Sequence, residues 1–240
     1  MNELSIIFPA YKEGENLSVL IPLLKQYLDR IDLKYQIIVV DSIEKMDDTE
    51  EICKSLAVDY YKREIGNTYG DAIRTGISKI QYSKTIIMDA DGSHHPKYIE
   101  DMFSNSKEYD LVIGSRYVKD GKTENNFILV FMSLVVNIAY RLFLKIKVKD
   151  VSDSFRLYHS EMLRSLELEC NNFDVVEEIL IKIILKYPNI KIKEVPIEFK
   201  KRVYGESKRK LLKFMFSYLV TIKRLIRIRN QYIKINKENS

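Results

Sequence analysis

The stretch KTIIMDADGSHHPKYI, residues 84–99, passes from a short apolar run into two aspartates that are one position apart. An apolar run of this length that ends in acids and a proline is typical of a buried strand followed by a turn. Asp89 and Asp91 would raise each other's pKa unless a cation neutralises them or the turn is solvated. A divalent ion such as Mg²⁺ or Mn²⁺ binds one or two carboxylates together with phosphate oxygens. The pair is therefore a candidate metal site, with a solvated turn as the alternative.

Similar apolar runs alternate with helical periodicity on both sides of this stretch. We expect strands over residues 4–8, 35–41, 58–63, 85–89 and 109–117, and helices over residues 13–30, 47–56, 70–80 and 96–106. Buried strands separated by helices predict an α/β fold, with a mostly parallel central sheet covered by helices on both faces. In such sheets ligands bind at the carboxyl ends of the strands, where Asp41 and Asp89 are expected. This placement favours a functional role for both.

The second half of the chain is organised differently. Residues 127–146 form a long apolar helical segment of roughly the 20 residues that span a membrane. Because Asn137 and Arg141 interrupt it, we expect an amphipathic helix that packs on the domain or lies at a membrane interface. A helix over residues 172–187 and a strand over 190–199 precede a basic amphipathic helix. We expect one domain over residues 1–210 and a C-terminal helix over residues 211–240.

Composition limits the classes of function. The 240 residues are 46% hydrophobic, and the 2 cysteines are too far apart to predict a zinc site or a disulfide framework. The first residues do not resemble a signal peptide, so we expect a cytoplasmic protein. From Lys200 onward, 13 Lys or Arg against 2 Glu give +11, which leaves −6 for the rest of the total of +5.

A basic tail of this kind suggests an anionic partner, such as phosphate, nucleic acid or a membrane surface, with a solvated helix as the alternative. Tryptophan is absent and the tyrosines are scattered, which argues against a stacking platform for single-stranded nucleic acid. We therefore expect no nucleic-acid partner. The remaining expectation is peripheral contact with the inner face of a membrane.

Five blocks occur along the chain in a specific order. They are SIIFPAYKEGENL (5–17), MDADGSHHP (88–96), GSRY (114–117), VSDSFRLY (151–158) and EVPIEFKKRVYGESK (194–208). In this order and spacing the chain resembles the inverting GT-A glycosyltransferases, in the branch of dolichyl-phosphate mannose synthases and polyprenyl-phosphate glucosyltransferases. The resemblance implies a GT-A fold, a UDP- or GDP-linked sugar donor, and Mg²⁺ or Mn²⁺ as cofactor.

The same resemblance implies a set of donor-binding residues. Matched by position, these are Pro9, Tyr11, Glu13, Asp41, Asp89 and Asp91. Asp91 would be the direct metal ligand, and Asp89 a metal or ribose contact. Asp41 would contact the base, but the usual D-D-x-S-x-D-x-T reads DSIEKMDDT here, with Ser42 in place of the second aspartate. This departure leaves the identity of the base open.

Cationic and acceptor-side residues follow from the resemblance as well. Arg116 would lie near the phosphates, with a structural salt bridge as the alternative, and Arg202 would act from a loop that closes over the site. The implied acceptor-binding residues are Arg116, Ser133, Ser207 and Lys208. Gly70 and Gly76 would be close-packing positions, and His95, which precedes Pro96, would brace the loop.

The acceptor itself stays open. A lipid phosphate is already ionised and attacks unaided, whereas a sugar hydroxyl needs a general base. The apolar helix and the basic tail favour a polyprenyl or dolichyl phosphate. Glu177 and Glu178 lie where hydroxyl-using relatives keep a base, and we expect Glu178 to be catalytic, with an exposed helix face as the alternative. A nucleotidyltransferase would begin with a glycine-rich loop, which PAYKEGEN is not; a non-catalytic membrane-binding module remains as a second class.

Overall fold

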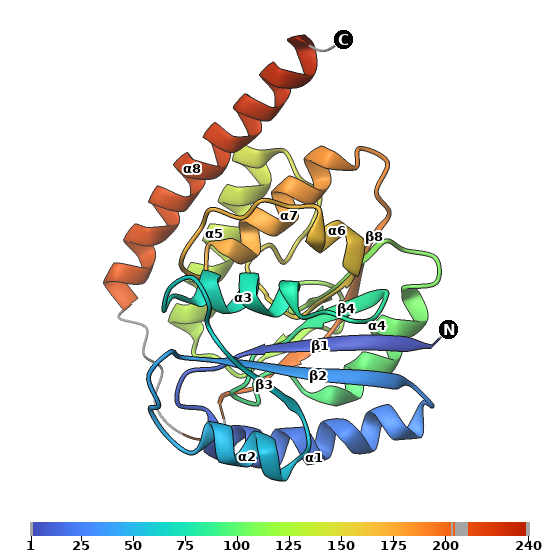
Figure 1. The fold of residues 1–240 in the computed structure, drawn as a ribbon. Coiled ribbons are helices and arrows are strands. Elements are labelled where there is room, and N and C mark those ends of the chain that lie inside the picture. Colours follow the sequence, from blue (N-terminus) through green and yellow to red (C-terminus); the bar gives the residue numbers. More distant parts are fainter. Residues whose placement is uncertain (1, 203, 205–210, 239–240) are drawn as a thin grey trace.

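The computed structural model describes residues 2–202, 204 and 211–238, with side chains left out of the description at 211–219 and 235–238. Its centre is a seven-stranded sheet in the order β3-β2-β1-β4-β7-β5-β8 (Figure 1). The strands are β1 (Glu3–Pro9), β2 (Lys34–Asp41), β3 (Asp59–Lys62), β4 (Lys84–Ile87), β5 (Leu111–Ser115), β7 (Arg156–His159) and β8 (Ile192–Pro196). All neighbouring pairs are parallel except those of β7, which runs antiparallel to β4 and β5. The expected α/β fold with a mostly parallel sheet is confirmed.

Helices cover both faces of this sheet. On one face lie α3 (Tyr69–Ser78), α5 (Phe127–Leu144), α6 (Ser160–Arg164) and α7 (Val175–Lys186); on the other lie α1 (Gly14–Arg30), α2 (Thr49–Ser55) and α4 (Ile99–Asn105) (Figure 1). Successive side chains of a strand point to opposite faces, so Ile6 packs in one hydrophobic cluster and Ile7 in the other. Both faces being buried explains why the strands read as continuous apolar runs.

The strands β6 (Lys122–Thr123) and β7 and the helix α6 were not predicted from the sequence. The strand β7 begins in the VSDSFRLY block and ends at His159, and the short helix α6 follows it directly. Arg156 obscures the strand pattern, because it is fully buried and its guanidinium donates to the backbone oxygens of Val176 and Val151. The helix predicted over residues 96–106 is divided into a 3₁₀ turn, η1 (Pro96–Tyr98), and α4. A two-stranded sheet of β6 and β9 (Glu198–Phe199) completes the fold.

The helix α5 departs from the amphipathic pattern that we expected. Its buried residues are Asn137, Tyr140 and Leu144, while apolar side chains also line its exposed side. These exposed residues are Phe127, Ile128, Phe131, Leu134, Val135, Ile138, Leu142 and Phe143. By length and composition alone α5 is apolar enough to cross a membrane. We define these eight side chains as the α5 apolar surface.

The C-terminal helix α8 (Leu211–Glu238) lies against α5 and α7, and its last turns project beyond the body of the protein (Figure 1). Ile222, Leu225 and Ile228 of α8 belong to the same hydrophobic cluster as the inner faces of α5 and α7. Arg224 pairs with Asp174, 3.0 Å away. The middle of α8 is thus joined to the domain by burial as well as by charge.

Candidate active site

A cleft lies at the carboxyl edge of the sheet, where β4 and β5 end. It encloses about 430 Å³ of space between atoms, part of which is open solvent at its mouth. It is lined by Tyr69, Asp89, His94, Arg116, Ser152, Asp153, Ser154, Phe173, Val176, Glu177 and Phe199. Tyr69 and Phe173 form an aromatic pair with ring centroids 4.5 Å apart. The cleft therefore combines one aromatic wall with a charged floor.

The two aspartates of the MDADG turn are half-buried at this edge rather than fully solvated. Asp89 lines the cleft, and its Oδ1 accepts a hydrogen bond from Ser154 Oγ at 2.8 Å. Asp91 accepts a hydrogen bond from the backbone N–H of Ser93 at 3.0 Å. Gly92, which follows Asp91, has φ of 80°, a conformation that glycine adopts without strain. Although burial lowers the pKa of His94, both carboxylates lie near enough to His94 to raise it.

These residues fit a divalent ion that is shared with a substrate. Within the described part of the chain, no group of three or more His, Cys, Asp or Glu residues forms a closed metal site. The ionised residues that line the cleft are Asp89, Asp153 and Glu177 against Arg116, a balance of −2. A diphosphate entering such a site requires an additional cation. Mg²⁺ and Mn²⁺ are satisfied by one or two carboxylates plus phosphate oxygens and water, which matches the pair Asp89 and Asp91.

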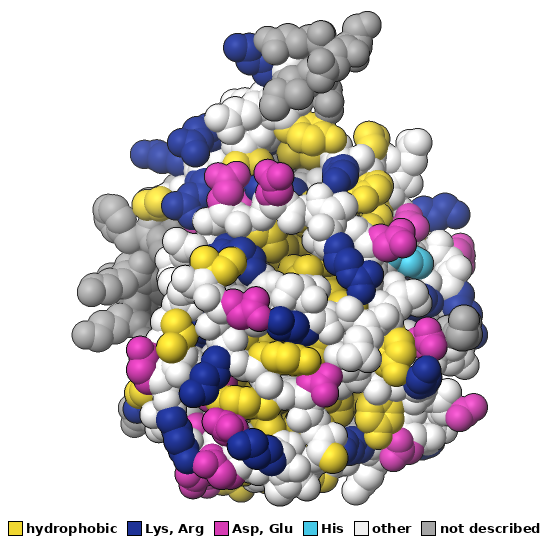
Figure 2. Space-filling view, in the orientation of Figure 1, with side chains coloured by type: hydrophobic (Ala, Val, Ile, Leu, Met, Phe, Trp, Pro, Cys, Tyr) yellow, Lys and Arg dark blue, Asp and Glu magenta, His cyan; other side chains and the backbone are white. Residues whose placement is uncertain are grey.

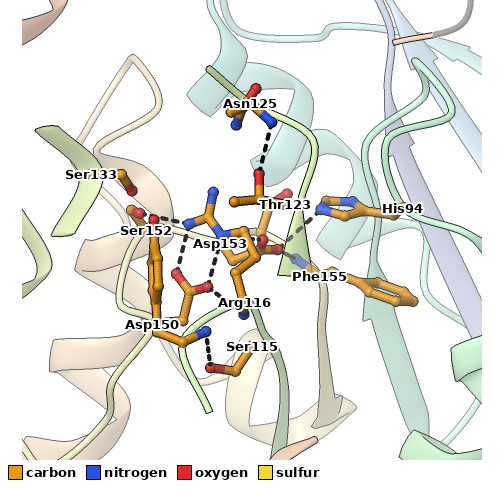
Figure 3. A network of polar contacts seen from close by, with 12 residues as sticks. His94, Ser115, Arg116, Thr123, Asn125, Ser133, Asp150, Ser152, Asp153 and Phe155 are labelled. Atoms are coloured by element: carbon orange, nitrogen blue, oxygen red, sulfur yellow. Dashed lines mark hydrogen bonds and ion pairs between the residues drawn. The ribbon is translucent and has the colours of Figure 1, made fainter. Parts of the chain in front are cut away.

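Arg116 follows β5 and lines the cleft. Its Nε and Nη2 donate to the two oxygens of Asp150 at 2.8 and 2.7 Å, and Nη2 also donates to Ser152 Oγ at 3.1 Å (Figure 3). The carboxylate of Asp153 lies 3.3 Å from Nε. Burial would lower the pKa of Arg116, but Asp150 and Asp153 hold it well above its usual value.

The structural salt bridge given as the alternative for Arg116 is present, and the side chain also lines the cleft, so its contact with phosphates stays a prediction. One edge of the guanidinium is fixed by carboxylates. Its Nη1 forms no hydrogen bond with any residue that the structure describes. Since the side chain lines the cleft, Nη1 is the group that remains for a ligand phosphate.

Arg202 and Glu13 meet although they are 189 residues apart in the sequence. Nη2 of Arg202 lies 2.7 and 2.8 Å from the two oxygens of Glu13, and Asn16 donates to the same carboxylate. Burial raises the pKa of Glu13, Arg202 lowers it, and nearby Asp91 raises it further, which places this pair near the MDADG turn. Ser207 and Lys208 lie outside the described residues.

The predicted nucleoside side of the site lies where β1, β2 and β3 end. Asp41 is buried and accepts a hydrogen bond from the Ser42 N–H at 2.7 Å; burial raises the pKa of Asp41. Pro9 ends β1, and Tyr11, which is 37% exposed, follows it. Arg63 joins this group, because its Nη2 donates to the Ala10 oxygen at 2.7 Å and its charge interacts with Asp41 and Tyr11. The sequence analysis missed Arg63, since an arginine after a strand carries no signal of its own.

The insertion in DSIEKMDDT brings Asp47 back to the start of α1. Its Oδ2 accepts the backbone N–H of Gly14 at 2.9 Å, and its Oδ1 accepts from the Thr49 hydroxyl at 2.6 Å. Asp47 therefore joins the first turns of α1 and α2 and also raises the pKa of Asp41 through its charge.

The placement of Glu178 corrects our expectation for the general base. Glu178 is fully buried, accepts from the backbone N–H groups of Glu169 and Cys170, and pairs with Lys182 at 2.8 Å. Its carboxylate is thereby committed to the loop before α7. Glu177, which is 3% exposed, lines the cleft instead. The alternative of an exposed helix face is also wrong for both residues.

Two smaller expectations concern residues near the cleft. Ser133 on α5 is linked to the Arg116 group, because Asn137 Nδ2 donates to the Ser133 backbone oxygen at 2.9 Å and lies 3.4 Å from Ser152 Oγ. His95 caps the turn η1, since its Nδ1 accepts the Lys97 N–H at 3.1 Å. The bracing role expected for His95 is confirmed.

Comparisons with known proteins identify relatives of this chain. The chain is 34% identical over 244 residues to the dolichol-phosphate mannosyltransferase of Pyrococcus furiosus, an alignment that covers 98% of this chain and 67% of the relative. An uncharacterized protein of Methanocaldococcus jannaschii is 29% identical, over 85% of this chain and 83% of that protein.

Among solved structures, glucosyl-3-phosphoglycerate synthase from Mycobacterium tuberculosis in complex with Mn²⁺, UDP and glucosyl-3-phosphoglycerate superposes with a TM-score of 0.72. That match has 17% identity and covers 94% of this chain and 80% of the other, so it supports the fold. The family model for glycosyl transferase family 2 matches residues 5–166. With this match and the 34% identity, the chain belongs to glycosyl transferase family 2 and is a glycosyltransferase.

Proposed function

We propose that this enzyme transfers a sugar, with inversion, from a UDP- or GDP-linked donor to a polyprenyl or dolichyl phosphate. An oxygen of the acceptor phosphate attacks the anomeric carbon, and the bond from that carbon to the donor diphosphate breaks. The nucleoside diphosphate leaves with the charge that develops. Because a phosphate acceptor is already ionised at neutral pH, this reaction needs no general base.

Different residues of the cleft would bind the nucleoside, the metal ion and the phosphates of the donor. Asp41, Tyr11 and Arg63 would bind the nucleoside, while Asp89 and Asp91 would hold Mg²⁺ or Mn²⁺. The bound ion supplies electrostatic stabilisation of the leaving diphosphate. Nη1 of Arg116 would contact phosphate oxygens. One such contact is worth about 3–4 kcal/mol of transition-state stabilisation, by analogy with an oxyanion-hole donor.

Arg202 and Glu13 would exchange partners when the donor binds. In the structure the two side chains neutralise each other. A ribose hydroxyl can take the place of Arg202 as donor to Glu13, and a phosphate can take the place of Glu13 as acceptor for Arg202. Ser207 and Lys208 would act from the same segment on the acceptor side.

One observation carries the choice of a lipid phosphate: polar contacts lead from the cleft to α5, the helix whose outer side carries the α5 apolar surface. Arg116, Ser152 and Asn137 form a chain of polar contacts that reaches Ser133 on α5. The outer side of the same helix exposes Phe127 by 83% and Leu142 by 71%. An acceptor with an anionic head and an isoprenoid tail matches these two adjoining environments.

The α5 apolar surface also supports peripheral binding at the inner face of a membrane. Arg141 lies on α5, and Lys145, Lys147 and Lys149 follow it as exposed residues that alternate with buried Ile146 and Val148. Basic side chains beside an exposed apolar helix are typical of interfacial segments on anionic lipids. By contrast, the face seen in Figure 2 shows basic, acidic and hydrophobic side chains interspersed.

A sugar hydroxyl acceptor is the second candidate, and the position of Glu177 favours it. Glu177 lines the cleft near the start of α7, where the helix dipole stabilises a carboxylate. It is therefore placed to accept the proton of an attacking hydroxyl. If the acceptor is a lipid phosphate, Glu177→Gln should leave the turnover number within a few-fold of the wild type. If the acceptor is a hydroxyl, the same substitution should lower the turnover number by about 100-fold or more.

The test combines a donor panel with two acceptor classes. UDP- and GDP-sugars are assayed with Mg²⁺ or Mn²⁺ against a polyprenyl phosphate and against hydroxyl acceptors that include 3-phosphoglycerate. Transfer to the polyprenyl phosphate, lost in Asp91→Ala and retained in Glu177→Gln, supports the proposal. Transfer to a hydroxyl only, lost in Glu177→Gln, would replace it.

Flotation with anionic liposomes tests the membrane contact. Phe131→Ser and Leu142→Ser together would weaken flotation, because they remove apolar area from the α5 apolar surface. Ile65→Ser is the matched control, since Ile65 is 76% exposed on the loop after β3. Equal flotation of the double variant and the wild type would remove the membrane contact.

A further inference from the structure

The segment that connects α5 to β7 contacts both functional groups of the cleft. Asp150 and Ser152 hold Arg116, whereas Ser154 donates to Asp89. Between them, Asp153 lies 3.3 Å from the Arg116 Nε and 3.0 Å from the His94 Nε2 (Figure 3). Residues 150–154 therefore lie between the arginine and the aspartate and contact each of them.

His94 contacts both the carboxylate of Asp153 and the backbone of Asp89. Its Nδ1 accepts the Asp89 N–H at 3.1 Å, and its Nε2 lies 3.0 Å from an oxygen of Asp153. The ring stacks on Phe155 with centroids 4.9 Å apart and meets Phe199 edge-on at 5.3 Å. Because the side chain is buried between these rings, it has little freedom to turn away from Asp89.

Asp153 is itself held in place. Its Oδ1 accepts the Phe155 N–H at 2.8 Å, and its Oδ2 faces Arg116. Burial would raise the pKa of Asp153, but His94 and Arg116 lower it below its usual value. The close approach of Asp153 to Nε2 helps to hold the ring in the orientation in which Nδ1 accepts from the Asp89 N–H.

We propose that Ser154, His94 and Asp153 are positioning residues that set the orientation of Asp89 toward the divalent ion. Ser154 fixes the carboxylate of Asp89, and His94, oriented by Asp153, fixes its backbone. Partners of this kind typically change metal affinity by about 10–100-fold when removed. The inference rests on the proposed function, because it takes Asp89 to be a metal contact.

Two pairs of substitutions separate positioning from general stability. Ser154→Ala removes the hydroxyl that Asp89 accepts from, and Ser154→Thr keeps it. His94→Asn keeps an oxygen near the position of Nδ1, whereas His94→Gln keeps an amide nitrogen near Nε2 and leaves the Asp89 N–H without its acceptor. Ser160→Ala is the matched control, since Ser160 is also buried but its hydroxyl pairs with Thr85, away from the cleft.

The measurement is the dissociation constant of Mn²⁺, titrated by electron paramagnetic resonance with excess UDP or GDP, whichever stabilises the wild type more. Urea unfolding of each variant and the KM for Mn²⁺ are measured in parallel. Ser154→Ala and His94→Gln should weaken Mn²⁺ binding about tenfold. Ser154→Thr, His94→Asn and Ser160→Ala should stay within about threefold, which is below that range.

Wild-type Mn²⁺ affinity in both Ser154→Ala and His94→Gln would overturn the inference. The inference would also be overturned if the loss of Mn²⁺ affinity simply followed the loss of free energy of unfolding across all variants, including the control Ser160→Ala. Asp89→Asn separates the metal role proposed for Asp89 from the positioning role inferred for Ser154, His94 and Asp153. If Asp89→Asn binds Mn²⁺ as the wild type does, the metal role of Asp89 fails, and the positioning inference fails with it; if Asp89→Asn weakens binding and the other variants do not, only the positioning inference fails.

Discussion

Replacing Arg116 by lysine keeps the positive charge in the cleft but removes the planar guanidinium. In the wild type Nε and Nη2 bridge both oxygens of Asp150, and Nη2 also reaches Ser152. The side chains of Asp150 and Asp153 are both fully buried, and Asp150 depends on this arginine for neutralisation while Asp153 interacts with both Arg116 and His94. A lysine nitrogen cannot make the two parallel bonds.

The expected cost follows from these contacts. Arg116→Lys loses about two hydrogen bonds to charged groups, each worth about 1.5–3 kcal/mol, so we expect the free energy of unfolding to fall by about 3 kcal/mol. Arg116→Met also removes the charge and leaves the buried carboxylate of Asp150 uncompensated. For that variant we expect a loss of about 5 kcal/mol, the upper end for a broken buried ion pair.

Urea unfolding at pH 7, followed by circular dichroism, measures both variants. Arg141→Lys is the control, because Arg141 is exposed on α5 and should change the free energy of unfolding by less than about 0.5 kcal/mol. Equal losses for lysine and methionine would refute the role assigned to the charge. A loss below about 1 kcal/mol for Arg116→Met, the size expected of a surface pair, would refute the burial argument altogether.

Three further predictions concern the packing and ionisation of single residues. A methyl group at Gly70 would lie 2.2 Å from the Cys170 oxygen, so Gly70→Ala should lower the free energy of unfolding by about 1–3 kcal/mol; no change would show that α3 can shift away. Because burial raises the pKa of Asp41, its ionisation disfavours the folded state above the usual value of 3.8. Asp41→Asn should therefore raise the free energy of unfolding at pH 7, with the gain vanishing at pH 3, and a gain independent of pH would contradict this. Burial also raises the pKa of the Cys53 thiol to about 12, so iodoacetamide at pH 8 should label Cys53 only in urea, and rapid native labelling would contradict its placement.

The alternation of apolar runs with helical periodicity was enough to predict the class of fold. Parallel strands buried on both faces leave a pattern that local sequence carries, and Asp41 and Asp89 follow two of those strands. The order of the blocks along the chain predicted the family. Sequence failed at β7, where buried Arg156 interrupts the apolar pattern; it predicted the helix α5 but not which of its apolar residues the domain leaves exposed.

The composition of the site was decided by tertiary structure. Glu13 and Arg202 are 189 residues apart, and their pairing depends on the path of every strand between them. Glu177 and Glu178 are adjacent on one helix, where successive side chains differ in direction by about 100°. Which of them faces the cleft is set by the rotation of α7 against the sheet, and this rotation depends on long-range packing that no local pattern encodes.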